Sequence, residues 1–295
     1  STDAPAFASR KYTFEAQRES ASTAWPKVPF TEQMRDEGYT ILCPQMAPIH
    51  FDLVKEVFRG AGYNLELLPS TDHDAVEAGL RYVNNDICYP SILVTGQIME
   101  AIESGRYDLS KTAVVISQTG GGCRASNYIH LLRKALVKAG YPQIPVASLN
   151  FSGLEKGSGL PLTVPLLRKV IASIFYGDML VALRSQTHAY ENHRGDADAM
   201  TEKWISTIQG WIRDDKNYSA HDMKRRFYDI AADYATIPIT RVPKVKVGVV
   251  GEIYVKYSPL GNNDLQKFLE SQDCEVNLPG LMGFVEYLSL IHISE

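Results

Sequence analysis

The sequence has few cysteines for its length, and neither sign of charge dominates it. Its 295 residues include 4 cysteines, and its 30 Lys and Arg residues nearly balance its 34 Asp and Glu residues. A charged fraction of 22% and a hydrophobic fraction of 45% are typical of a globular protein, which excludes a disordered or collagen-like chain. Because no basic block is present, the composition does not favour nucleic acid or an anionic membrane surface as a partner.

Long apolar runs are also missing. A helix that crosses a membrane needs about 20 predominantly apolar residues, and here Lys, Arg, Asp or Gly interrupts each of the longer runs. The four cysteines lie far apart, unlike the dense cysteines of a small secreted disulfide scaffold. Since we also find no signal peptide, we expect a protein of the reducing cytoplasm whose thiols are free for metal binding or chemistry.

The pattern of apolar segments divides the chain into four parts. Residues 1–35 are polar and irregular and predict a linker or a packed extended arm. Over 36–160, short apolar runs alternate with helix-length segments, which is typical of a parallel sheet with helices on both faces. Residues 161–240 predict three helices, and 241–295 predict the start of another sheet domain. The fold class is therefore α/β, with two Rossmann-like parallel-sheet domains, a helical segment between them and a truncated second domain.

Individual elements follow from apolar periodicity and from glycines that end helices. The expected strands are 39–43, 65–68, 113–117, 144–149, 245–250 and 274–278. The expected helices outside the helical segment are 49–59, 74–83, 91–103, 125–138 and 264–270. The chain begins at Ser1 without Met, and residues 288–295 resemble translated adapter read-through. We therefore expect a fragment of a longer protein.

A glycine-rich segment at 117–127 carries the strongest functional signal. It follows a predicted parallel strand and opens a helix, which is where open α/β sheets bind ligands. Gly120, Gly121 and Gly122 allow a ligand to approach the backbone closely. Cys123 comes next, near a helix N-terminus that favours a thiolate. A tight turn with a buried cysteine and a phosphate cradle are the alternatives, whereas the spacing excludes Walker A and G-x-G-x-x-G motifs.

The other cysteines differ in their predicted surroundings. Cys88, within Asn-Asn-Asp-Ile-Cys-Tyr-Pro at 84–90, occupies the same kind of loop-to-helix junction as Cys123. If both loops flank one crevice, their thiols converge and favour metal ligation. Cys43 ends the first strand, where a metal ligand and a small buried residue are equally good interpretations. Cys274 starts a strand beyond a helix, and we expect it in the core.

Iron–sulfur ligation explains widely spaced cysteines better than zinc. Structural zinc sites usually use close pairs, and neither C-x-x-C nor H-x-x-x-H accompanies these cysteines. The ligands of an iron–sulfur cluster can come from separated loops. His50 could face the crevice, although we expect it to be solvated or to cap its helix, and we expect His130 to pack or to lie at the surface. Neither histidine forms a recognisable triad with Ser and Asp.

At these segments the sequence resembles the 2-hydroxyacyl-CoA dehydratase superfamily. The specific likeness is to the dehydratase-like region of acyl-CoA dehydratase activase-related proteins. The matching segments span residues 40–285 in order: 44–50, 84–90 with Gly96 and Gln97, 118–128, 176–178, and 247–253 with Asn262 and Asn263. The glycine-cysteine segment is the most specific of them.

The resemblance implies an oxygen-sensitive 4Fe-4S cluster between two Rossmann-like domains, held by cysteines that match Cys88 and Cys123. Cys43 is the third candidate ligand, although the activase-related pattern does not typically have cysteine there. In the dehydratases, an ATP-dependent activase supplies one electron, and the resulting ketyl radical anion of an acyl-CoA substrate expels its hydroxyl group. Relatives with a double-cubane cluster reduce small molecules instead. Because the sequence has no ATPase motif, the activase is an expected partner domain or subunit, in a dimer or a larger fused chain.

Three functions stay open at this point. The first is an iron–sulfur redox module for radical dehydration or reduction of an acyl-CoA-type substrate. The second is a non-catalytic electron relay or scaffold that docks the activase. The third is an anion- or phosphate-binding domain that uses Gly120, Gly121 and Gly122 as a nest, but this gives no reason for Cys88.

Overall fold

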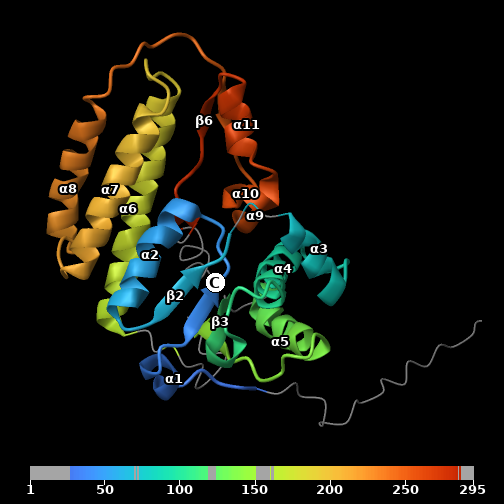
Figure 1. Ribbon diagram of the computed structural model, residues 1–295. Helices are drawn as coiled ribbons and strands as arrows, with labels where there is room; N and C mark the ends of the chain where they lie inside the picture. Colours follow the sequence, from blue (N-terminus) through green and yellow to red (C-terminus); the bar gives the residue numbers. More distant parts are fainter. Residues whose placement is uncertain are drawn as a thin grey trace, which may run out of the picture.

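A four-stranded parallel sheet with the strand order β2-β1-β3-β4 forms the centre of the computed structural model (Figure 1). The structure describes residues 27–69, 71, 73–118, 124–150, 160, 163–284 and 286. The strands are β1 (Thr40–Cys43), β2 (Asn64–Leu67), β3 (Thr112–Gln118) and β4 (Val146–Asn150). All four form where the sequence predicts them, and the α/β class with a parallel sheet is confirmed.

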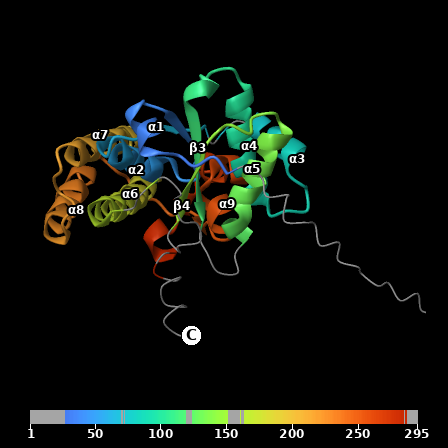
Figure 2. The same ribbon diagram turned by 90° about the horizontal axis from the view of Figure 1, so that it is seen from below.

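Helices cover both faces of this sheet, as Figure 2 shows from below. One face packs against α2 (Pro48–Gly60) and α6 (Val164–His188), and the other against α4 (Tyr89–Glu103) and α5 (Tyr128–Lys138). Side chains of β1 alternate between the two faces of the sheet. Ile41 and Cys43 belong to the core on the α2 and α6 side, whereas Leu42 belongs to the core on the α4 and α5 side. A residue's place in the strand therefore decides which face of the sheet it lines.

Helix α4 is held against α3 (Asp74–Tyr82) by two glycines. A Cβ atom at Gly96 would lie 1.7 Å from the carbonyl oxygen of Ala75, and one at Gly79 would lie 2.1 Å from that of Ile92. The two backbones approach so closely that no side chain fits between them. This packing fixes the position of α4 and, with it, the loop that precedes the helix.

The helical segment forms the three helices that its periodicity predicts. They are α6, α7 (Asp196–Arg213) and α8 (Ala220–Tyr234), which lie side by side in Figure 1. Gly195 precedes α7 with a φ of +100°, a left-handed conformation that favours glycine. Within the described part of the chain, no helix is both long and apolar enough to cross a membrane.

A second, two-stranded parallel sheet pairs β5 (Lys246–Gly248) with β6 (Glu275–Asn277), and α11 (Leu265–Ser271) connects them as predicted. The stretch before α11 carries no predicted helix, yet it forms α9 (Ile253–Tyr257) and α10 (Pro259–Asn262). Glu252 and Ser258 cap these helices by accepting hydrogen bonds from the backbone N–H groups of Val255 and Gly261. Helices this short show no apolar periodicity, so the sequence pattern did not reveal them.

The remaining elements are short. They are α1 (Glu32–Asp36), η1 (Leu109–Lys111) and η2 (Arg124–Asn127). Helix α1 lies in the segment predicted to be irregular. Phe30, just before it, is buried in the core on the α2 and α6 side of the sheet. The described end of the predicted arm is therefore packed on the sheet domain.

Candidate functional site

Cys88 lies at the N-cap of α4, the loop-to-helix junction that the sequence predicts. Pro90 stands in the first turn of the helix, where its missing N–H group leaves no bond unsatisfied. The Cys88 side chain is partly exposed, and its Sγ lies 2.8 Å from the Oη of Tyr128. Tyr128 opens α5 and follows Cys123 by five positions in the sequence. The Cys88 loop thus contacts the helix that comes directly after the glycine-cysteine segment.

The glycine-cysteine loop itself lies outside the described residues. This applies to Gly120, Gly121, Gly122 and Cys123, so their assignment as ligand-binding residues stays a prediction. Strand β3 ends just before this loop and the short helix η2 begins just after it. A strand before the segment and a helix after it are therefore present, as the sequence predicts.

Cys43 has different surroundings from Cys88. Its side chain belongs to the core on the α2 and α6 side of the sheet, whereas Tyr128, the partner of Cys88, packs on the α4 and α5 side. The Cys43 Sγ donates a hydrogen bond to the carbonyl oxygen of Pro44, and burial raises the pKa of the thiol to about 12. A metal ligand is a thiolate, so Cys43 would have to lose its proton in a buried, apolar position to bind a cluster, and its assignment as a ligand stays a prediction.

Cys274 is partly exposed, and the expectation that it belongs to the core is wrong. It directly follows Asp273, whose φ of +62° lies in the left-handed region, and it directly precedes β6. Among the described residues, no three His, Cys, Asp or Glu side chains meet closely enough to hold a metal ion. Cys123 falls outside that set.

His50 is buried rather than solvated, and it is not a helix cap. It lies in the first turn of α2, and its Nε2 is 2.8 Å from the Oδ1 of Asp178 on α6. A Cβ atom at Gly177 would lie 2.4 Å from the imidazole ring, so only glycine there lets α6 approach His50. The sequence contained one signal for this pair, because Gly177 and Asp178 belong to a segment that carries the resemblance.

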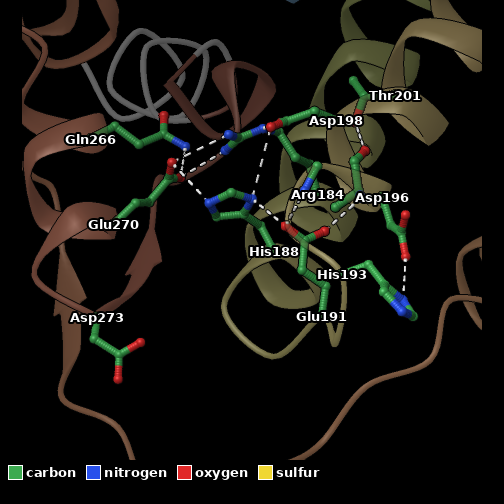
Figure 3. Close-up of polar contacts among 12 residues, drawn as sticks. Arg184, His188, Glu191, His193, Asp196, Asp198, Thr201, Gln266, Glu270 and Asp273 are labelled. Carbon is green, nitrogen blue, oxygen red and sulfur yellow. Dashed lines mark hydrogen bonds and ion pairs between the residues drawn. The ribbon is translucent and has the colours of Figure 1, made fainter.

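A second polar site links the helical segment to the smaller sheet. Arg184 on α6 lies between two carboxylates: its Nε is 2.6 Å from Asp198 Oδ1, and its Nη1 is 2.7 Å from Glu270 Oε1 (Figure 3). Burial alone lowers the pKa of Arg184, but the hydrogen bonds and charges of Glu270 and Asp198 outweigh it and raise the pKa. The guanidinium therefore stays charged and joins α6, α7 and α11.

His188, one turn after Arg184, lies beside the same carboxylates in Figure 3. Its Nδ1 is 3.0 Å from Glu191 Oε1 and its Nε2 is 3.5 Å from Glu270 Oε2. Glu191 also accepts hydrogen bonds from the backbone N–H groups of Gly195 and Ala197, at the start of α7. The carboxylates of Glu191, Asp198 and Glu270 thus already accept hydrogen bonds from groups of the protein. This indicates a structural role for the cluster that they form with Arg184 and His188.

A cleft of about 170 Å³ adjoins this cluster, between α6 and the helices α9 to α11. Its wall includes Val249 and Leu278, which follow the carboxyl ends of β5 and β6. Its charged residues are Arg184, Lys256, Lys267, Asp264 and Glu270. Burial lowers the pKa of Lys256, and the charges of Asp178 and Glu252 oppose this shift. Because the charges are of both signs, the cleft does not select a ligand of one charge.

Comparison with known proteins adds no family. The chain matches no protein-family model, no curated protein and no solved structure. The likeness to the dehydratase superfamily therefore rests on the sequence segments alone.

Proposed function

We propose that the chain is an iron–sulfur redox module of the 2-hydroxyacyl-CoA dehydratase type, working in the cytoplasm. It takes an electron from an ATP-dependent activase for the dehydration or reduction of an acyl-CoA-type substrate. The observation that carries this proposal is the contact of Cys88 with Tyr128 at the start of α5. A bound 4Fe-4S cluster would supply one-electron transfer, and Cys88 and Cys123 would hold it.

The surroundings of Cys88 support a ligand role. Its side chain is partly exposed and stands at the N-terminus of a 15-residue helix, where backbone N–H groups and the helix dipole favour a negative charge. No side-chain hydrogen bond caps this helix end. The Tyr128 hydroxyl can donate a hydrogen bond to a thiolate at this distance, and such bonds to the sulfurs influence the potential of a cluster.

The third thiolate comes from a residue other than Cys43 in this proposal. Cys43 is a buried, neutral thiol on the other face of the sheet. Because the resemblance implies a cluster between two domains, we place the third thiolate on another domain or subunit.

Anaerobic reconstitution with iron and sulfide, in the presence of the domain or subunit that supplies the third thiolate, tests the proposal. We expect a broad brown absorbance in the wild type that is lost in Cys88→Ala and Cys123→Ala and kept in Cys43→Ala. A colourless protein under all anaerobic conditions would contradict it. Titration of the reconstituted protein with an acyl-CoA thioester then separates the redox enzyme from the electron relay, because a relay shows no specific binding.

A further inference from the structure

An apolar cavity of about 250 Å³ lies between the main sheet and the helices α2 and α6. Side chains of all four strands of the main sheet and of both helices form its wall, among them Ile41, Leu65, Val115, Leu149, Val54 and Val170. The exposed surface of the cavity is entirely apolar. The cavity lies on the face of the sheet away from α4 and α5, so it is separate from Tyr128, the partner of Cys88.

Among the described lining residues, three carry polar side-chain groups, and each of these residues contacts a residue outside the wall. The Cys43 Sγ donates to the carbonyl oxygen of Pro44, the His50 Nε2 bonds to Asp178, and the Arg35 guanidinium lies 5.8 Å from the centroid of the Tyr63 ring. A buried water molecule needs two to four polar partners, and the described residues of this wall do not offer them. This part of the wall therefore disfavours water and any ligand that must form hydrogen bonds.

The size of the cavity also points to a ligand. An engineered apolar cavity of about 150 Å³ stays dry and binds benzene, and this cavity is larger. Close packing is the rule in protein interiors, where voids larger than a water molecule are few. A void of this size in a natural core, with a uniformly apolar wall, has the shape and chemistry of a binding site.

We propose that this cavity binds an uncharged hydrocarbon group about the size of benzene or toluene. The group belongs either to a free molecule or to the apolar end of a larger one, since both present the same chemistry to the wall. Recognition rests on shape and burial alone, so a single added hydroxyl group would be left without a hydrogen-bond partner and would weaken binding.

Thermal unfolding of the cluster-free Cys88→Ala protein with toluene or phenol tests the proposal independently of the iron site. Toluene at ten times its Kd should raise the Tm by about 2–4 °C. Phenol should bind about tenfold more weakly, because its hydroxyl would be buried unpaired. Octanoate that competes with toluene would identify the apolar end of a larger molecule as the natural occupant, and octanoate that does not compete would identify a free hydrocarbon.

Two variants in α6 provide a matched pair. Val170→Phe fills the cavity and should abolish the toluene-induced shift, whereas Val164→Phe, at a position 64% exposed, should keep it. Should the first variant fail to fold, modification of Cys43 by a small thiol reagent in Cys88→Ala, followed by mass spectrometry of the Cys43 peptide, gives a second readout, because bound toluene should slow it. No Tm shift with toluene and no protection of Cys43, or equal binding of toluene and phenol, would overturn the proposal.

Discussion

The carboxylate of Asp178 accepts a hydrogen bond from the Nε2 of His50 at 2.8 Å, although 128 positions separate the two residues in the chain. The same carboxylate accepts hydrogen bonds from the backbone N–H groups of Leu281 and Met282, at 2.6 and 2.9 Å. One side chain of α6 thus joins α2 to the segment that follows β6. The main sheet and the smaller sheet are connected through this carboxylate.

Replacing Asp178 should therefore destabilise the fold. Asp178→Ala leaves two N–H groups and an imidazole nitrogen without their acceptor, and we expect a loss of about 3 kcal/mol in the free energy of unfolding. Asp178→Asn keeps one acceptor oxygen and should lose about half as much. Denaturant unfolding measures both, with Asp214→Ala, at an aspartate 62% exposed, as a surface control that should change little. Equal stability of Asp178→Ala and the control would contradict this role.

The ion pairs of Arg184 with Asp198 and Glu270 give a second prediction about stability. Arg184→Met leaves the Glu270 carboxylate, which is 9% exposed, without its cation, and we expect a loss of about 3 kcal/mol. Lys203→Met removes a surface ion pair with Asp233 and should have only a small effect. Chemical denaturation at matched ionic strength compares the two variants. A loss no larger than that of the surface variant would show that the cluster is not a structural link.

Backbone packing of α3 on α4 can be tested with alanine. Gly96→Ala forces a Cβ atom into the carbonyl group of Ala75, so we expect a loss above about 4 kcal/mol or no folded protein. Gly210→Ala, inside α7 where only Arg213 Nη2 comes within 4 Å of the new atom, should instead stabilise by about 0.5–1 kcal/mol. Thermal unfolding separates the two. A stable Gly96→Ala protein would show that the helices can move apart.

The buried Cys43 thiol predicts a dependence of stability on pH. Its folded pKa of about 12 lies above the value of roughly 8.5 for an exposed thiol, so its contribution is complete below that pH and is lost as the pH rises toward 12. Between pH 9 and 11, the wild type should lose about 2 kcal/mol more stability than Cys43→Ala. Val115→Ala, a buried change without a titratable group, should follow the wild type. Parallel pH profiles of the wild type and Cys43→Ala would contradict a raised pKa.

The main elements of the fold could be predicted because their signals are local. The apolar pattern of the sequence marks strand β1 and helix α4. Pro90 in addition marks the start of α4, and it correctly predicted that Cys88 lies at a helix N-terminus. Helices α9 and α10 escaped prediction because five or four residues are too few for a periodic pattern.

The surroundings of individual side chains were harder to predict. The burial of His50 depends on Asp178 and Gly177, which come from a distant helix. The environment of Cys43 depends on which face of the sheet it lines, and a cysteine before proline does not reveal that. Cys274 directly follows Asp273 and is partly exposed, which apolar periodicity does not reveal. The surroundings of His50 and Cys43 are set by tertiary contacts rather than by neighbours in the chain.

Iron and acid-labile sulfide content per chain, measured after anaerobic preparation of the protein together with the domain or subunit that supplies the third thiolate, tests the redox assignment most directly. We predict that the wild type contains iron and sulfide in a ratio of about one to one, and that Cys274→Ala, which replaces a partly exposed thiol just before β6, contains as much of both as the wild type. Cys88→Ala should lose both. Iron and sulfide that are absent from the wild type, or that persist in Cys88→Ala, would contradict the assignment of Cys88 as a cluster ligand.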